Sequence, residues 1–239
     1  MKSSSKVSET GQHGQNEYGG EIVRAILMWC VGLVGTAIAV AIGYFWLDRP
    51  IALWVHQHSL YLPQNLAQWL ATNISGSLTP VAAVISFGLV VRWIVLRSVP
   101  RSYEEVALIC CLSVLITEAI KSQLKSLFGR AWPETWFNNN PSFIRDGDYG
   151  FHFMHGNYVY QSFPSGHMAI TCAVISVLWV LRPKWRWFYS IVVLMVGSGL
   201  ILTNLHFLSD VVAGAFVGVS IGGALVVVWT KTRRKGGSG

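Results

Sequence analysis

The chain has 239 residues, of which 52% are hydrophobic and only 12% are charged, and its mean hydropathy is +0.46. This composition excludes an ordinary soluble domain and indicates an integral membrane protein. The net charge of +7 is distributed over the ends of apolar segments rather than gathered in one patch, so it does not indicate a nucleic-acid partner.

The predicted elements begin with a polar segment, residues 1–23, that lacks the short apolar core and small-residue cleavage site of a secretory signal. We expect a cytoplasmic tail here, followed by an uncleaved first membrane span. Uncharged runs near the roughly 20 residues that cross about 30 Å of hydrocarbon predict three spans, and three shorter or interrupted runs predict three more. In chain order the six predicted spans are residues 25–47, 76–96, 106–120, 168–181, 187–205 and 211–230.

The basic residues predict how these spans are oriented. If the N-terminus is cytoplasmic, thirteen of the eighteen Lys and Arg residues lie on the cytoplasmic side, in agreement with the positive-inside rule. We therefore expect an all-α, polytopic protein of the bacterial inner membrane with both termini in the cytoplasm. Residues 24–235 would form its six-helix membrane domain, and residues 236–239 look like a vector-derived remnant.

The connection between the third and fourth spans, residues 121–163, is far longer than two neighbouring helices need. Its aromatic side chains predict an ordered loop on the outer face, because Trp and Tyr favour the headgroup level. Two alternatives stay open, namely that the rings form an interfacial belt only or that they also contact a substrate. The rings are Trp132, Trp136, Phe137, Phe151, Phe153, Tyr158 and Tyr160.

Polar side chains gather at the outer ends of several predicted spans. Lipid offers such groups no solvation, so their presence there indicates a functional site. The groups are Lys125 and Arg130 after the third span, Ser165, Gly166 and His167 at the start of the fourth, and His206 and Asp210 between the fifth and the sixth.

These residue types suit phosphoryl transfer. A neutral imidazole is a competent nucleophile near pH 7, and Asp210 has the spacing to orient His206 if a helix begins by His206. The second histidine, His167, can protonate the departing oxygen. The cations, the hydroxyl and the backbone N–H groups at a helix start supply what a phosphoryl group needs.

This scheme requires no metal ion and no other cofactor. The four cysteines lie within predicted spans, without the spacing of a zinc site or a disulfide framework. We read them as small apolar side chains.

Three motifs resemble those of the type 2 phosphatidic acid phosphatase family, whose fold is shared with vanadium haloperoxidases. They are Lys125 with Gly129-Arg130 and Pro133, then Pro164-Ser165-Gly166-His167, then His206 and Asp210 followed by Ala213-Gly214. The resemblance covers roughly residue 106 to the end of the sixth span and implies a metal-independent lipid phosphatase. It also implies that His206 forms a phosphohistidine, that Asp210 orients it, and that His167 acts as acid and then base. By the same resemblance, Lys125, Ser165 and Gly166 would hold the phosphate.

The chain departs from the family pattern at two phosphate-binding arginines. Where each arginine is expected in register, the chain has Trp132 and Leu200. We expect Arg130 to swing into the first vacancy and bind phosphate, whereas Arg145 and Lys121 are weaker candidates for the second. A pocket with fewer cations favours a less charged phosphodiester, or transfer to an acceptor other than water.

Several other polar or small residues have simpler explanations. The remaining histidines are expected to form interfacial hydrogen bonds, and Glu118 an ion pair with Lys121. Three glycines spaced by four in the sixth span, Gly214, Gly218 and Gly222, predict close helix packing.

We therefore predict a membrane phosphatase that hydrolyses a lipid-linked phosphate or pyrophosphate at the outer, periplasmic face. The alternatives are a phosphotransferase that moves a phosphoryl group or phospho-headgroup between lipids, and a catalytically inactive lipid-phosphate binding protein. The expected partners are the lipid phosphate substrate and membrane lipids, while the substrate's identity and the oligomeric state stay open. The prediction requires His167 and His206 to face each other across one phosphorus centre.

Overall fold

The computed structural model of the protein describes residues 4–58, 64–97, 99–136, 139–155 and 158–236. Within these ranges the chain is helical and contains isolated β-bridges but no β-strand, which confirms the all-α prediction for the described residues. In chain order the elements are α1 (Ser4–Ile42), the π-helical η1 (Gly43–Leu47), α2 (Asp48–His58), α3 (Gln64–Leu96), α4 (Ser102–Phe128), α5 (Phe143–Asp146), η2 (Tyr158–Tyr160), α6 (Gly166–Leu181), η3 (Pro183–Trp185), α7 (Arg186–Leu202) and α8 (Leu208–Gly236).

Four helical stretches among the described residues are long and apolar enough to cross a membrane. They are Val23–His58, Ser77–Leu96, Pro183–Leu202 and Leu208–Arg233. The two remaining predicted spans lie in α4, which carries more charge, and in α6, which is apolar but only 16 residues long. Their membrane crossing therefore stays a prediction.

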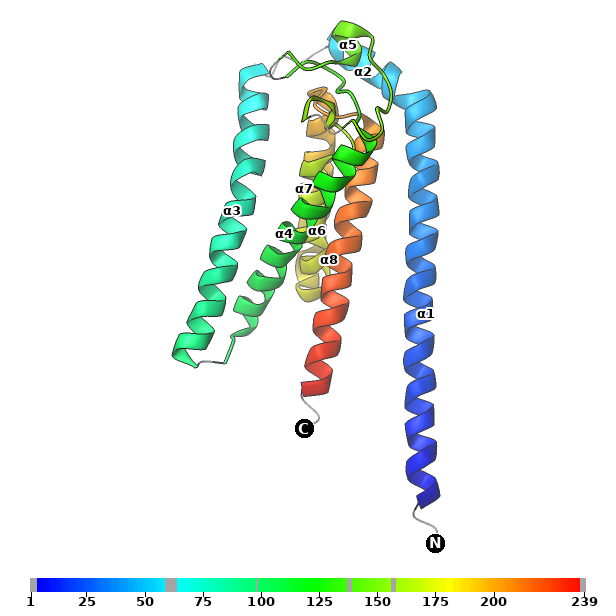
Figure 1. The fold of residues 1–239 in the computed structure, drawn as a ribbon, viewed down its shortest axis with the longest axis vertical. Helices are drawn as coiled ribbons and strands as arrows, with labels where there is room; N and C mark the ends of the chain where they lie inside the picture. The colour runs from blue at the N-terminus through cyan, green and yellow to red at the C-terminus, as the bar shows by residue number, and fades with distance from the viewer. Residues whose placement is uncertain (1–3, 59–63, 98, 137–138, 156–157, 237–239) are drawn as a thin grey trace.

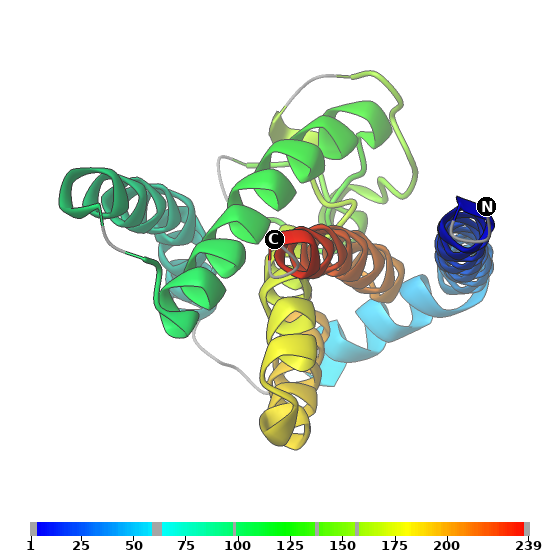
Figure 2. The ribbon, with the colours of Figure 1, turned by 90° about the horizontal axis from the view of Figure 1, so that it is seen from below.

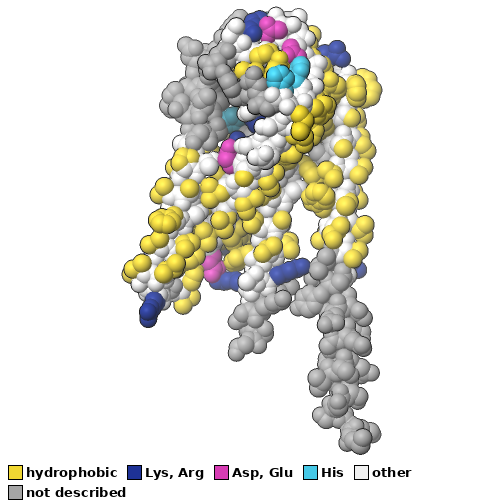
Figure 3. Space-filling view, viewed as in Figure 1, with side chains coloured by type: hydrophobic (Ala, Val, Ile, Leu, Met, Phe, Trp, Pro, Cys, Tyr) yellow, Lys and Arg dark blue, Asp and Glu magenta, His cyan; other side chains and the backbone are white. Residues whose placement is uncertain are grey.

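Hydrophobic side chains cover the described helices over most of their length, and charged side chains gather near the two ends (Figure 3). Many large apolar side chains point outward, as Val84 on α3 and Leu194 on α7 do with about 70% of their surface exposed. In water such a surface would aggregate, whereas in lipid it is solvated. This distribution supports a protein that crosses a bilayer several times.

Helix α6 lies at the centre of the bundle. It packs most extensively against α8 and next against α4, while α3 lies on the outer side of α4 (Figure 2). Glycines permit the close approach of α8, since a Cβ atom at Gly214 or Gly218 would collide with the backbone carbonyl of Ser165 or Ala169. The predicted role of these glycines in close helix packing is confirmed.

Helix α1 stands apart from this bundle over most of its length (Figure 1). It contacts α8 through Trp29, whose Nε1 donates to Ser220 Oγ at 3.0 Å and whose ring centroid lies 5.9 Å from that of Phe216. The helix begins at Ser4 and so includes most of the polar residues 1–23, whose place in the cytoplasm stays a prediction. At its other end, η1 and α2 turn the chain across the top of the bundle in Figure 1.

The connection between α4 and α6 lies over the same end of the bundle as α2. Backbone bridges join Arg130 to Phe151 and Gln161, and Trp132 to Ser142. Rings from the loop pack around Phe151, which lies 5.2 Å from Phe163 between ring centroids. Phe137 and the side chain of Tyr158, which the aromatic prediction also named, lie outside the described residues.

Candidate active site

Three segments far apart in sequence meet at one end of the bundle. The end of α4 carries Lys125, the start of α6 carries His167, and the turn between α7 and α8 carries His206. Figure 1 shows these three helix ends together at the top. The ring centroids of His167 and His206 lie 6.1 Å apart, with an angle of 64° between the ring planes. The structure thus brings the two imidazoles together, while their facing each other across a phosphorus centre stays a prediction.

The start of α6 is tied directly to the start of α8. Ser165 is the N-cap of α6, where its hydroxyl accepts from the backbone N–H of Met168, and its own N–H donates to the carbonyl of Asp210 at 3.0 Å. Gly214 allows this contact, because a side chain there would meet the Ser165 carbonyl. Two of the three motifs are therefore held together by backbone contacts.

The two ring nitrogens of His206 lie in different surroundings. Its side chain is about 1% exposed, and its Nδ1 lies 3.5 Å from Asp210 Oδ2 and 3.4 Å from Ser162 Oγ. Ser162 Oγ also donates to the same Asp210 oxygen at 2.6 Å. The opposite ring nitrogen, Nε2, is buried and has no hydrogen-bond partner among the described residues. Such an arrangement orients the ring and leaves Nε2 for another atom.

The local structure around His206 differs in one respect from the prediction. Helix α8 begins at Leu208, so His206 precedes the helix instead of starting it. The pairing with Asp210 nevertheless forms, since the carboxylate turns back to accept from the N–H of Phe207 at 3.1 Å and approaches the ring.

Burial governs the protonation of His206. Burial lowers the pKa of its imidazole below the ordinary value, and Lys125 acts in the same direction, although the hydrogen bond and charge of Asp210 oppose the shift. The neutral ring, which carries the lone pair that a nucleophile needs, is therefore favoured at neutral pH.

Arg130 lies in a position that we did not expect. It is fully buried, and its Nη1 donates to Asp210 Oδ1 at 2.5 Å, while its Nη2 donates to Asp48 Oδ2 at 2.8 Å. Burial opposes its charge, but these two carboxylates hold the pKa of Arg130 above its ordinary value. Both terminal nitrogens are thus occupied by carboxylates, an arrangement that favours support of Asp210 over the expected contact with phosphate.

Apolar groups fill the two positions where the family pattern has arginine. The Trp132 ring lies 5.1 Å from the His206 ring, and Lys125 Nζ lies 5.6 Å from the centroid of the same indole. Leu200 belongs to a buried cluster with Met168 and other apolar residues of α6, α7 and α8. The Trp132 ring therefore forms an apolar wall of the site beside His206.

One of the two alternative cations lies beside the start of α6. Lys121 Nζ is so close to Gly166 that a Cβ atom added there would lie 2.9 Å away from it. Lys121 also pairs with Glu118 at 3.1 Å, which confirms the predicted ion pair. Arg145, by contrast, lies on α5 and bonds to Asp146 and Asn139.

Sequence reasoning missed two groups that the structure brings to this end of the bundle. Asp48 is 1% exposed and bonds to Arg130, and Ser162 bonds to both His206 and Asp210. A usable signal existed for Asp48 only, because it is the first charged residue after the first predicted span and lies on the same predicted side as the motifs. Among the described residues, no group of three or more His, Cys, Asp or Glu side chains is placed to hold a metal ion.

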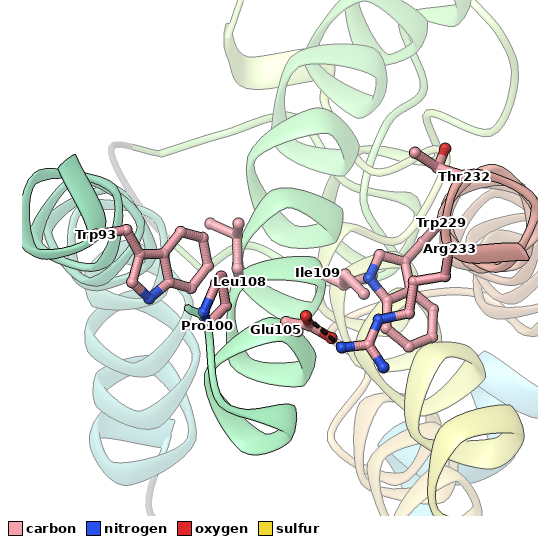
Figure 4. Close-up of a pocket in the computed structure, with 8 residues that line it drawn as sticks. All are labelled: Trp93, Pro100, Glu105, Leu108, Ile109, Trp229, Thr232 and Arg233. Carbon is pink, nitrogen blue, oxygen red and sulfur yellow. Dashed lines mark hydrogen bonds and ion pairs between the residues drawn. The ribbon is translucent and has the colours of Figure 1, made fainter. Parts of the chain in front are cut away.

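A separate cavity of about 620 Å³ lies at the opposite end of the bundle (Figure 4). There Trp93 of α3 and Arg233 of α8 flank Glu105 of α4, and Arg233 pairs with Glu105 at 2.5 Å. Glu105 and Arg233 lie at the far ends of α4 and α8 from the histidine site, so the cavity is distinct from that site.

Comparison with known proteins gives one family match and three similar proteins. The model of the PAP2 superfamily matches residues 106–234, more than half of the chain. Lipid A 1-phosphatases of Rhizobium etli and Rhizobium johnstonii are each 26% identical over 106 residues, which cover 44% of this chain and 43% and 41% of those proteins. The chain thus matches less than half the length of these curated relatives.

The fold is also similar to a solved structure. The crystal structure of the first transmembrane PAP2 type phosphatidylglycerolphosphate phosphatase from Bacillus subtilis matches 85% of this chain and 96% of that one, with a TM-score of 0.53 and 16% identity. At this identity the likeness concerns the fold alone.

Proposed function

This chain belongs to the PAP2 superfamily, and we propose that it is a membrane phosphatase that hydrolyses a lipid-linked phosphate or pyrophosphate through a phosphohistidine. The observation that carries the proposal is the buried Nε2 of His206, which lacks a hydrogen-bond partner among the residues that the structure describes. Its ring centroid lies 6.1 Å from that of His167. A buried polar atom without a partner is costly, and a substrate atom at that position would remove the cost.

In the proposed reaction, the lone pair of His206 Nε2 attacks phosphorus and the bond from phosphorus to the lipid oxygen breaks. His167 gives its proton to the departing oxygen, a contribution typically worth about 10²- to 10⁴-fold. In the second step His167 takes a proton from water, the water oxygen attacks phosphorus, and the P–N bond breaks to release phosphate. Asp210 stabilises the positive charge on the His206 ring in both steps.

The phosphate-binding groups that we propose are Lys125, Lys121, and Ser165 with the backbone N–H of Gly166. Lys125 lies against Trp132 next to His206, and Lys121 lies over the start of α6. Backbone N–H groups at a helix start favour an anion. Arg130, which we expected to bind phosphate, is assigned instead to the support of Asp210.

We further propose that α4 and α6 complete six membrane spans within one domain, residues 24–235. Both termini would then lie in the cytoplasm and the histidines at the periplasmic face of the inner membrane. The excess of Lys and Arg on the predicted cytoplasmic side supports this orientation. Accessibility of single cysteines, introduced at Asn139 and Lys184, to a membrane-impermeant thiol reagent tests it, because the two positions should react from opposite sides.

A phosphotransferase is the second candidate function. The observation that favours it is the Trp132 indole, which lies against His206 where the family pattern has an arginine. An indole in place of a guanidinium lowers the charge beside His206 and offers an apolar surface to a second lipid. An acceptor hydroxyl would then replace water in the second step. The relatives named lipid A 1-phosphatases suggest a lipid A phosphate as the first substrate to test.

The test is turnover by the purified full chain, with chelator present, on glycerophospholipid, polyprenyl and lipid A phosphates. We expect phosphate release, together with an acid-labile, base-stable phosphoryl label on the protein that is absent from His206→Ala. Label transfer to an added lipid acceptor, with little free phosphate, would favour the transferase. Binding without label or release from any of these substrates would favour a catalytically inactive binding protein.

A further inference from the structure

Asp48 is a buried carboxylate that lies outside the segment matched by the family model. It is the first residue of α2, directly after the π-helical η1, and it is 1% exposed. We propose that Asp48 is a positioning residue of the active site, which shares Arg130 with Asp210 and so leaves the charge of Asp210 available to His206. This inference rests on the proposed function, because it assigns Asp48 to the support of the same nucleophile.

Two hydrogen bonds and one longer contact link Asp48 to His206. Arg130 Nη2 donates to Asp48 Oδ2 at 2.8 Å, and Arg130 Nη1 donates to Asp210 Oδ1 at 2.5 Å. The other oxygen of Asp210 lies 3.5 Å from His206 Nδ1. Each link therefore joins groups of opposite charge, or a carboxylate to the nucleophilic ring.

Ser209 fixes Asp48 from the side of α8. Its backbone N–H donates to Asp48 Oδ1 at 3.0 Å, and its hydroxyl donates to Asp48 Oδ2. Arg130 Nη1 also donates to the same hydroxyl, at 2.6 Å. Both oxygens of Asp48 are thus bonded, as a buried carboxylate requires.

Contacts of η1, the segment just before α2, hold the Asp48 carboxylate in place. A Cβ atom added to Gly43 of η1 would lie only 3.0 Å from Ser209 Cβ, so η1 lies directly against the start of α8. Tyr44 of η1 stacks on Tyr149 and Phe151, and its ring lies 5.3 Å from the Arg130 guanidinium carbon. Single π-helical turns within α-helices frequently mark functional sites.

The charge balance explains what Asp48 contributes. Asp210 and Arg130 alone would form a neutral pair, and Arg130 would compete with His206 for the Asp210 charge. With Asp48 present, the buried trio carries one net negative charge beside the His206 ring. In a buried site that charge stabilises the ring when it becomes positive, whether by protonation or by phosphorylation.

Charged and titratable groups at this end of the bundle come from several elements, and the proposal must be tested against all of them. They are Asp210 of α8, Lys125 and Lys121 of α4, His167 of α6, Arg130 of the loop after α4, and Asp48 of α2. Of these groups, Asp48 and Arg130 act through Asp210.

The test compares Asp48→Asn with Ser209→Ala in the purified full chain. Asp48→Asn removes the charge and keeps the shape. Ser209→Ala removes the hydroxyl, which donates one hydrogen bond to Asp48 and accepts one from Arg130, and leaves every charge in place. We expect Asp48→Asn to lower kcat roughly tenfold to a hundredfold. Loss of a group that orients another functional side chain through hydrogen bonds has an effect of this size at metal sites. It should also move the acid limb of the kcat/KM profile to lower pH, because His206 then protonates less readily. Ser209→Ala should keep the wild-type acid limb.

Two further measurements keep the test decisive. The titration of His206, followed by NMR of ¹⁵N-histidine-labelled protein, should shift to lower pH in Asp48→Asn even without substrate. If Asp48→Asn does not fold, the double variant Asp48→Asn/Arg130→Gln replaces it. This variant removes both charges of the pair and leaves the negative charge of Asp210, so its His206 should titrate near the wild-type pH. An unchanged titration and acid limb in Asp48→Asn, or a shifted titration in the double variant, would overturn the proposal. Absence of phosphate release by the wild type would instead overturn the proposed function, while the NMR titration still reports on Asp48.

Discussion

The two ends of the bundle treat charge differently. At the histidine end, the side chains of Asp48, Arg130 and Asp210 are completely buried and bond to one another. At the opposite end, Arg233 is 54% exposed in its pair with Glu105, and Arg92 is 35% exposed in its pair with Glu104. The charged side chains of the histidine end are thus shielded from solvent, whereas the two arginines of the opposite end stay partly exposed.

This difference in burial indicates which charges serve the site and which serve the stability of the fold. A buried ion pair often stabilises a protein no better than apolar residues of similar size, and loss of one partner leaves a costly unpaired charge. An exposed pair contributes about 0–1 kcal/mol. Three buried charges behind a histidine are therefore better explained by the chemistry of that histidine than by the stability of the fold.

The comparison is tested most severely at His206 itself. His206→Ala removes the proposed nucleophile, and we expect phosphate release to fall by about 10⁴-fold or more. His58→Ala is the matched control, because His58 is exposed at the end of α2 and stacks on Trp54. The measurement is phosphate release from the lipid substrate identified in the turnover screen. Substantial phosphate release by His206→Ala would exclude a phosphohistidine at His206.

The second largest effect is expected at His167. His167→Ala should lower kcat by about 10²- to 10⁴-fold, since the departing oxygen then leaves without a proton. A substrate with an acidic leaving group, such as a nitrophenyl phosphate ester, needs less protonation. Its burst of nitrophenol should therefore be affected much less than release from the lipid substrate, and equal losses on both substrates would contradict the acid role.

A smaller effect is expected where α6 and α8 hold the two motifs together. Gly214→Ala places a methyl group against the Ser165 carbonyl, and overpacking of this kind typically costs about 1–3 kcal/mol of unfolding free energy. Gly223→Ala is the control, because no atom lies within 4 Å of its added Cβ. Thermal unfolding in detergent should show a lower midpoint for Gly214→Ala alone, and equal midpoints would show that the helices can separate without cost.

The smallest effect is expected at the opposite end. Glu105→Gln removes the charge that pairs with Arg233, and we expect phosphate release to stay within about twofold of the wild type, with at most about 1 kcal/mol lost in stability. Release and unfolding are measured as for the other variants. A loss of activity comparable to that of Asp48→Asn would erase the contrast between the two ends.

The sequence predicts which side chains come together in the site better than it predicts the hydrogen bonds and ion pairs that position them. His167 and His206 lie in segments whose helix ends fall on one predicted side, and topology alone brings them together. Asp48 escaped prediction because its partner, Arg130, is 82 positions further along the chain and no local pattern links them. The same long-range pair explains why Arg130 lies behind Asp210 and not in the vacancy at Trp132.

Helix limits were predicted less well than helix positions. Helix α1 begins at Ser4 although residues 1–23 are polar, and α8 begins at Leu208 although His206 and Asp210 have helical spacing. Hydropathy reports where a segment enters lipid, whereas a helix ends where its backbone hydrogen bonds find other partners. Here the Asp210 carboxylate accepts the Phe207 N–H and ends the turn before α8.

The position of Asp48 has a consequence for how this molecule can be divided. The stretch recognised by similarity starts at residue 106, yet the guanidinium inside it is neutralised in part by a carboxylate that precedes that stretch. A fragment trimmed to the recognisable portion would leave Arg130 one counter-charge short and open its aromatic surroundings to solvent. The smallest fragment that keeps this counter-charge therefore extends back to Asp48, and back to Gly43 if the contact of η1 with Ser209 is to be kept as well.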